Sequence, residues 1–216
     1  MFLPQMRAQA AAGPRPADAT SAPGGTRPIW RTALGWQVTV FMGLQSTVYY
    51  TLITFLPTIE QAAGASAATA GWHQFVLQIL SIGGSLGAAA LMHRLPDQRP
   101  LAIAYALLCG IGVTGVLLAP GLAVLWVGTL GLGVGGGIVF ALSLFGLRTA
   151  DHHRAGALSG MAQCLGYLLA AAGPVLIGAL HDAAGSWTPP LLVVLALLAI
   201  ALGSGVLAGR NRTVPA

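Results

Sequence analysis

Charge is scarce in this sequence of 216 residues. Only 7% of the residues are Asp, Glu, Lys or Arg, and lysine is absent. An ordinary soluble domain carries about 25% charged residues, so the shortage argues against that class of protein. The ten basic residues exceed the five acidic ones, which gives a formal net charge of +5. They are spread along the chain without forming a basic face, so we expect no nucleic acid as a partner.

Cysteine is also rare, and residues with the pattern of a reactive site are missing. Cys109 and Cys164 both lie in apolar stretches, where we expect small core residues rather than a disulfide framework. Asp151, His152 and His153 are adjacent, and neighbours cannot share one helical face, so a solvated loop is favoured over a metal site. No nucleophile, base and orienting group form a recognisable set. The sequence therefore predicts no enzyme, no metal centre and no cofactor.

The first 29 residues lack the continuous apolar core of a signal peptide. Their alanine, proline and glycine content is typical of a flexible linker. We expect residues 1–29 to be a disordered cytoplasmic linker, residues 30–210 a membrane domain and residues 211–216 a cytoplasmic tail. Because a linker ordinarily joins two parts of a chain, we expect the chain to be part of a longer protein.

Apolar residues dominate the remaining sequence. They make up 56% of the chain, and the mean hydropathy is +0.78. Six apolar segments are each long enough to cross about 30 Å of hydrocarbon as a helix. They lie near residues 34–56, 70–92, 101–119, 123–146, 156–180 and 189–208. The sequence therefore predicts an all-α integral membrane protein with six transmembrane helices.

The arginines predict the orientation. They precede the first segment, follow the sixth, and lie between segments 2 and 3 and between segments 4 and 5, while the other three connections have none. Cytoplasmic loops are rich in arginine and lysine, so both termini are expected in the cytoplasm. Arginine without lysine, together with abundant alanine and glycine, favours a bacterium with GC-rich DNA. We therefore expect a multi-pass protein of the bacterial inner membrane.

Polar side chains recur at helical spacing on three of the six segments. Ser159, Gln163 and Tyr167 follow one another four residues apart and form one stripe on the fifth segment. Such a stripe is costly in hydrocarbon unless it faces protein or a water-filled path. We therefore expect segments 1, 2 and 5 to face an interior and segments 3 and 6 to face lipid. The candidates for a solute pathway are Gln45, Tyr49, Gln74, Gln78, Ser81, Ser159, Gln163 and Tyr167.

This division, with the third member of each triplet outside, predicts a 3+3 inverted repeat. A weak internal similarity at an offset of 89 residues supports it. The matching pairs are Gly71 with Gly160, Gln74 with Gln163, and Gly84 with Gly173.

A glycine-rich stretch in the fourth segment has two interpretations. Gly131-Leu-Gly-Val-Gly-Gly136 satisfies the G-x-G-x-x-G pattern of dinucleotide sites, which requires a preceding strand. Here the glycines lie in the middle of an apolar helix, where small residues allow close helix packing. The pairs Gly131/Gly135, Gly133/Gly137 and Gly83/Gly87 are therefore predicted to be packing positions.

Two further features bear on mechanism. His73 lies near the outer end of the second segment and is either a proton relay or a hydrogen-bonded interfacial histidine. Gly173-Pro174 is expected to bend the fifth helix, because proline removes one backbone hydrogen bond. No Asp, Glu or Arg is expected in the middle of any helix.

Several stretches resemble a known family. Gly43-Leu-Gln-Ser-Thr-Val-Tyr-Tyr50 and Phe55-Leu-Pro57 resemble the seventh helix of the major facilitator superfamily. The stretch 158–187 resembles the eleventh helix and outer loop of its cyanate/nitroimidazole (CynX/NimT) branch. Arg94-Leu-Pro-Asp97-Gln-Arg99 resembles a degenerate copy of the superfamily's cytoplasmic loop motif, without the glycine before the last arginine.

The resemblance implies that the six helices are the C-terminal half of a twelve-helix transporter. Such a protein moves a small polar or anionic solute by alternating access, in which one half rocks against the other in the lipid bilayer. The partner would then be an N-terminal six-helix half. The alternative is a truncated, non-transporting fragment or a half-subunit that needs a partner half.

Overall fold

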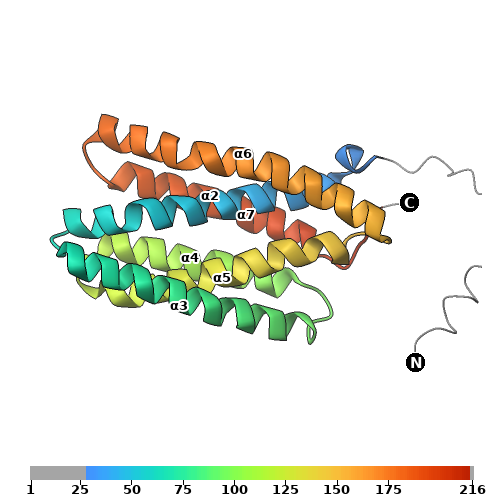
Figure 1. The fold of residues 1–216 in the computed structure, drawn as a ribbon, viewed down its shortest axis with the longest axis horizontal. Coiled ribbons are helices and arrows are strands. Elements are labelled where there is room, and N and C mark those ends of the chain that lie inside the picture. Colours follow the sequence, from blue (N-terminus) through green and yellow to red (C-terminus); the bar gives the residue numbers. More distant parts are fainter. Residues whose placement is uncertain (1–27, 215–216) are drawn as a thin grey trace, which may run out of the picture.

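The computed structural model describes residues 28–214, and these residues form a bundle of six long α-helices (Figure 1). Each helix is long and apolar enough to cross a membrane, which confirms the predicted all-α fold with six spans. Most of the linker predicted at residues 1–29 lies outside the described residues. The helices are α2 (Ala33–Ala62), α3 (Ala67–Met92), α4 (Arg99–Leu118), α5 (Ala123–Leu147), α6 (His152–Ala184) and α7 (Thr188–Ala208), with short 3-10 turns η1 (Ile29–Arg31) and η2 (Pro120–Leu122).

The helix contacts follow the predicted repeat. Helix α2 packs mainly on α6 and α7, while α5 packs mainly on α3 and α4, and α4 packs on α7. Exchanging α2 with α5, α3 with α6 and α4 with α7 leaves this set of main contacts unchanged. Because α2 and α5 start from opposite ends of the bundle (Figure 1), the two triplets are inverted with respect to each other.

Glycines bring α5 close to both of its neighbours. A Cβ atom on Gly131 would lie 2.5 Å from the carbonyl oxygen of Leu77 in α3, and one on Gly135 would lie 1.9 Å from that of Ser81. On another face of α5, a Cβ on Gly133 or Gly137 would meet α4. The predicted packing role is confirmed at these four glycines. It is wrong for Gly87, which faces open space, and Gly83 has only loose contact.

One glycine pair of the internal similarity has the same role in both triplets. A Cβ on Gly84 of α3 would lie 2.1 Å from the Leu132 carbonyl oxygen of α5, and one on Gly173 of α6 would lie 2.5 Å from Thr47 of α2. In each triplet the glycine therefore allows a close approach of its partner helix, which is α5 for Gly84 and α2 for Gly173. The pair Gly71 and Gly160 faces open space in both cases, so neither glycine is needed for packing.

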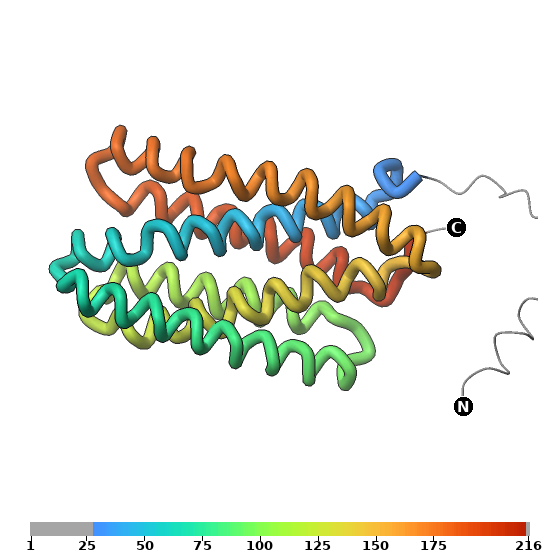
Figure 2. The backbone as a smooth tube through the Cα atoms, viewed as in Figure 1, coloured from blue at the N-terminus to red at the C-terminus, as the bar shows by residue number. Residues whose placement is uncertain are grey.

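The two ends of the bundle differ in charge. The first and last described residues lie at one end, together with the α3–α4 and α5–α6 connections (Figure 2). The arginines of the described chain all lie at this arginine end: Arg31, Arg94, Arg99, Arg148, Arg154, Arg210 and Arg212. The opposite end carries Glu60, His73, His181 and Asp182. Because arginine is enriched in cytoplasmic loops, this separation predicts that the arginine end faces the cytoplasm.

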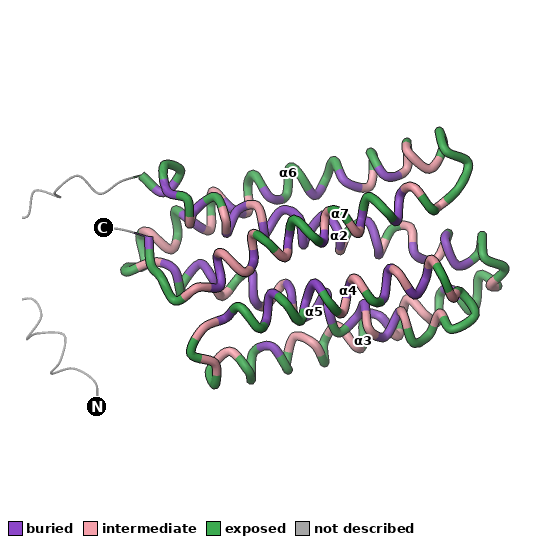
Figure 3. The backbone as a smooth tube through the Cα atoms, turned by 180° about the vertical axis from the view of Figure 1, so that it is seen from behind, coloured by how far each residue is buried: buried purple, intermediate pink, exposed green. Residues whose placement is uncertain are grey.

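The edge helices α3 and α6 are more exposed than the sequence suggests. In the most apolar window of each, 11% of the residues of α3 and 22% of those of α6 are buried, against 67% in α2 and 56% in the span containing α5. Figure 3 shows many residues coloured as exposed along α6 and α3. The sequence predicted that segments 3 and 6, which are α4 and α7, face lipid. In the most apolar windows of these two helices, however, 44% and 33% of the residues are buried. Within the described chain, α3 and α6 have large faces that nothing covers.

Two helices, α2 and α6, are longer than the sequence predicts. Helix α2 continues through Pro57 to Ala62 instead of ending at residue 56. Proline has no N–H to donate to the carbonyl of Ile53 one turn earlier. Gln74 Nε2 of α3 donates to that carbonyl oxygen at 3.4 Å, which compensates for the missing backbone bond.

Helix α6 runs from His152 to Ala184, so it begins before the predicted residue 156 and ends after residue 180. The Asp151 side chain caps its start by accepting from the Arg154 N–H, and Gly185 ends it in a left-handed conformation. Glu60, His181 and Asp182 lie beyond the predicted ends of the first and fifth segments, and the structure places them on the helices α2 and α6.

The two cysteines differ in accessibility. Cys109 is buried, as expected, but Cys164 is exposed on α6, so its assignment to the core is wrong. We expect a maleimide to label the folded chain in detergent once, at Cys164, because Cys109 has no access to solvent. The Cys164→Ser variant should remain unlabelled until it is unfolded, whereas labelling of that folded variant would contradict the packing of α4.

Candidate functional site

The predicted stripe on α6 lies on its exposed side. Gln163 Nε2 donates to Ser159 Oγ at 2.6 Å, which places both side chains on one face, and both are half-buried. Tyr167, one turn further on, is 41% exposed. The amide oxygen of Gln163 and the hydroxyl of Tyr167 are therefore available to a molecule that contacts this face.

The stripe on α3 serves two purposes. Gln78 is exposed, and Ser81 is half-buried. Gln74 instead turns toward α2 to donate to the Ile53 carbonyl oxygen, and its own amide oxygen is buried without a hydrogen-bond partner. Gln74 thus links two helices and retains one acceptor for a further donor.

The candidates on α2 are the least accessible. Gln45 is 1% exposed, and its Nε2 donates to Ser46 Oγ at 2.9 Å. Tyr49 is half-buried with its ring centroid 5.4 Å from that of Tyr50. Of these two residues, Tyr49 lies nearer the surface, whereas Gln45 belongs to the packed interior of the bundle in this structure.

The inverted repeat sets the depths of the glutamines. Gln163 follows the arginine end of α6 by 11 residues, or about 17 Å along the helix axis. Gln74 follows the opposite end of α3 by seven residues, or about 11 Å. These two glutamines, paired by the internal similarity, thus approach the middle of the bundle from opposite ends, while Gln78 and Tyr167 lie near the middle of their helices.

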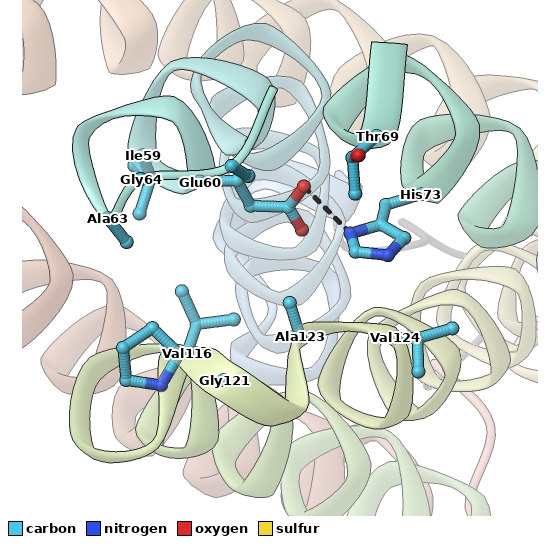
Figure 4. A pocket seen from close by; sticks show the side chains of 12 residues that line it. Ile59, Glu60, Ala63, Gly64, Thr69, His73, Val116, Gly121, Ala123 and Val124 are labelled. Atoms are coloured by element: carbon cyan, nitrogen blue, oxygen red, sulfur yellow. Dashed lines mark hydrogen bonds and ion pairs between the residues drawn. The ribbon is translucent and has the colours of Figure 1, made fainter. Parts of the chain in front are cut away.

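At the end of the bundle opposite the arginines, the carboxylate of Glu60 lies beside the candidate residue His73. Figure 4 shows this contact. Glu60 Oε2 lies 3.0 Å from His73 Nδ1, and the two side chains are 3% and 13% exposed. Glu60 lies beyond the predicted end of the first segment at residue 56, and no role beside His73 was predicted for it. Leu52, Leu56 and Ile59 continue the buried face of α2 past Pro57, and this helical spacing was the available signal for Glu60.

The arginine end contains a second cluster that the sequence did not reveal. Arg148 is 1% exposed, and its Nε donates to the Ala208 carbonyl oxygen at 2.7 Å. Its Nη2 donates to the Gly209 carbonyl oxygen at 3.1 Å and also to Gln98 Oε1. The Arg148 carbonyl accepts from the Val214 N–H at 2.8 Å, so part of the predicted tail is fixed here. These partners lie 50 or more residues away, and no local pattern marks them.

The predicted loop motif lies beside this cluster. Asp97 accepts from the Arg99 N–H at 3.2 Å and pairs with Arg99 Nε at 3.4 Å, while Arg94 is exposed. Burial lowers the pKa of the Arg148 guanidinium from its ordinary value, and the charge of Asp97 acts in the opposite direction. Arginine remains protonated despite such shifts, so Arg148 acts as a permanent donor here.

The predicted bend at Gly173-Pro174 lies within a continuous helix. Helix α6 passes through Pro174 without interruption, and Gly173 lets Thr47 of α2 approach closely. A bend at this position stays a prediction.

Comparison with known families identifies the bundle. Residues 3–174 match the family model described as "Major Facilitator Superfamily". The chain belongs to this superfamily. The match includes residues that were predicted to be a linker, and the six-helix inverted repeat agrees with half of the superfamily's twelve-helix fold.

Curated members of the superfamily are similar over most of this chain. The 2-nitroimidazole transporter of Escherichia coli (strain K12) is 41% identical over 214 residues, which cover 99% of this chain and 53% of that protein. The cyanate transport protein CynX of the same organism is 31% identical over 178 residues, covering 79% and 46%. A putative anionic 4-hydroxy-benzoate permease of Thauera aromatica is 49% identical over 158 residues, covering 73% and 79%. The chain spans about half the length of the two E. coli relatives.

Proposed function

We propose that this chain is the C-terminal half of a transporter that moves a small polar or anionic solute across the bacterial inner membrane by alternating access. In this proposal both termini are cytoplasmic, and the second half is a six-helix N-terminal bundle. The relatives with curated names are transporters or permeases, and two of them are about twice as long as this chain. The chain itself then acts as a carrier half rather than as an enzyme.

The exposed polar faces of α3 and α6 carry the proposal. Hydrogen-bonding side chains on a membrane helix are expected to face protein or water rather than lipid. Gln78 and Ser81 on α3 and Gln163 and Tyr167 on α6 are exposed or half-buried on the two least covered helices. A second half that packs against α3 and α6 would cover these helices and enclose a polar pathway between the halves.

The proposed pathway assigns different roles to the candidate residues. Gln78, Ser81, Ser159, Gln163 and Tyr167 contact the solute, since their polar atoms are accessible. Tyr49 and Gln74 contribute from the wall where α2 meets α3, and Gln45 supports them from the interior. The arginines of the described chain lie at one end of the bundle, away from the pathway residues. An anionic solute would therefore bind hydrogen-bond donors of this half and a positively charged group of the other half.

A complementation experiment tests the proposal. The chain is expressed in cells without the E. coli 2-nitroimidazole transporter, alone and together with the part of that transporter that it does not match. Uptake of labelled 2-nitroimidazole, cyanate and 4-hydroxybenzoate is then measured. We expect uptake of at least one solute when both parts are present. Uptake by the chain alone would favour pairing of two copies, and no uptake in any combination would favour the non-transporting fragment.

In the active combination, Gln163→Leu is expected to lower uptake about tenfold, because a lost hydrogen bond to the solute costs about 1.4 kcal/mol. The matched control is Gln61→Leu, since Gln61 is exposed near the end of α2 and bonds the Pro57 carbonyl oxygen of its own helix. Equal amounts of both variants in the membrane would show that folding is intact. Unchanged uptake by Gln163→Leu would remove α6 from the pathway.

A further inference from the structure

Buried Glu60 contacts half-buried His73 at a place where charge is expensive. Their 3.0 Å contact joins α2 to α3 in the wall of a cavity of about 320 Å³ (Figure 4). Ionisable groups on membrane helices are rare and usually functional, because the desolvation of a charge costs several kcal/mol. Yet Gln74 already links α2 and α3, and it does so without any charge.

The second oxygen of Glu60 points to a ligand. Glu60 Oε1 is buried and accepts no hydrogen bond, and it is directed into the cavity (Figure 4). A buried carboxylate oxygen without a donor is unfavourable, so this atom attracts a proton, a water molecule or a cation. The wall of the cavity opposite the pair is formed by the backbone and the apolar side chains of Val116, Pro120, Ala123 and Val124.

The charged groups around the pair are few. His181 of α6 lines an adjoining cavity that shares Ile59 and Ala63 with the first one, and its ring stacks on Trp187 at 3.8 Å. Asp182 follows it and is exposed. The arginines of the described chain lie at the other end of the bundle. Among the described residues lining the cavity, His73 is the one that can place a positive charge beside Glu60.

We infer that Glu60 and His73 form a proton-binding site that couples transport to a proton gradient, an inference that rests on the proposed function. With His73 neutral and Nδ1–H donating to Glu60, the pair has one negative charge. A proton added at His73 Nε2 gives an imidazolium–carboxylate pair without net charge. Neutralisation strengthens the contact of α3 with α2, and proton release weakens it. Proton occupancy thereby biases the position of α3, an exposed helix that carries part of the proposed pathway.

The Glu60→Gln variant separates coupling from transport, because the amide fits the same space but cannot hold the charge. The experiment uses vesicles that contain this chain and the complementary part of the E. coli transporter. Accumulation of the solute driven by a pH gradient is compared with exchange of the solute in the absence of a gradient. One proton moving down a gradient of one pH unit supports about tenfold accumulation. We expect Glu60→Gln to lose this accumulation and to retain exchange. His152→Gln, at the exposed start of α6, should retain both.

A second measurement does not depend on transport. The melting temperature of the purified chain in detergent should rise on mild acidification, and this rise should be absent in Glu60→Gln but present in His152→Gln. Unchanged accumulation by Glu60→Gln, accumulation that requires sodium, or an unchanged acid response of this variant would overturn the inference. Absence of exchange with the unmodified chain would instead count against the proposed function, and the melting experiment alone would then decide whether the pair binds a proton.

Discussion

We expect the Gly135→Ala substitution to lower the free energy of unfolding by about 3 kcal/mol. This value is at the upper end of the usual cost of overpacking a well-packed site. The new Cβ would lie 1.9 Å from the Ser81 carbonyl oxygen, and this oxygen belongs to the backbone of α3. A backbone atom cannot rotate away as a flexible side chain can, so α3 must move away from α5. The loss then extends to the neighbouring contacts of Gly131 and Gly84, which depend on the same close approach. Thermal unfolding in mild detergent, followed by tryptophan fluorescence, measures the effect.

The adjacent glycine provides a matched control. A Cβ on Gly136 would have its nearest neighbours at 3.6 Å and 3.7 Å, which is ordinary van der Waals contact. Alanine also favours a helix over glycine by about 0.5–1 kcal/mol. Gly136→Ala should therefore be neutral or more stable. Equal effects of the two substitutions would mean that helix propensity, and not the α3–α5 contact, determines the role of these glycines.

The second large effect is expected at Arg148. Arg148→Met should destabilise the chain by about 2–4 kcal/mol, since hydrogen bonds to a charged group contribute about 1.5–3 kcal/mol each and water replaces some of them at this end. The methionine has similar length but leaves the carbonyls of Ala208 and Gly209 and the amide of Gln98 without their donor. The α3–α4 connection and the end of α7 are then no longer held together by this side chain, whereas Val214 keeps its bond to the backbone carbonyl of residue 148. The measurement is again thermal unfolding in detergent.

Two variants show which property of Arg148 matters. Arg148→Lys keeps the charge but has one nitrogen in place of the fork that reaches three acceptors, so it should recover about half of the lost stability. Arg94→Met removes an exposed arginine of the same end and should change stability by less than about 0.5 kcal/mol. A comparable loss from Arg94→Met would indicate a general effect of charge at this end rather than the cluster around Arg148.

The candidate site was predictable to the extent that it depends on helical spacing. Ser159 and Gln163 lie four residues apart, and the structure joins them by a hydrogen bond, as neighbours on one helical face must be able to do. Gln45 and Tyr49 have the same spacing, yet Gln45 is buried. Spacing shows which residues share a face, but it does not show which face another helix covers.

Glu60 illustrates a second limit. The first predicted segment ends at residue 56, directly before Pro57, and proline has no N–H to continue the backbone hydrogen bonds of a helix. The compensating donor, Gln74, is 21 residues further along the chain and on another helix. The continuation of α2, and with it the pairing of Glu60 with His73, therefore depends on a contact that the local sequence does not contain.

The sequence by itself determined the number of spans, the inverted repeat, the position of the arginines and the polar stripe of α6. These features follow from hydrophobic length, charge and helical period, which are local properties of the chain. The tertiary structure decided which glycines allow helices to touch, that Arg148 joins segments 50 or more residues apart, and that Glu60 meets His73. The physical reason is that these interactions act over less than about 4 Å between atoms that are far apart in sequence, so they exist only once the helices have packed.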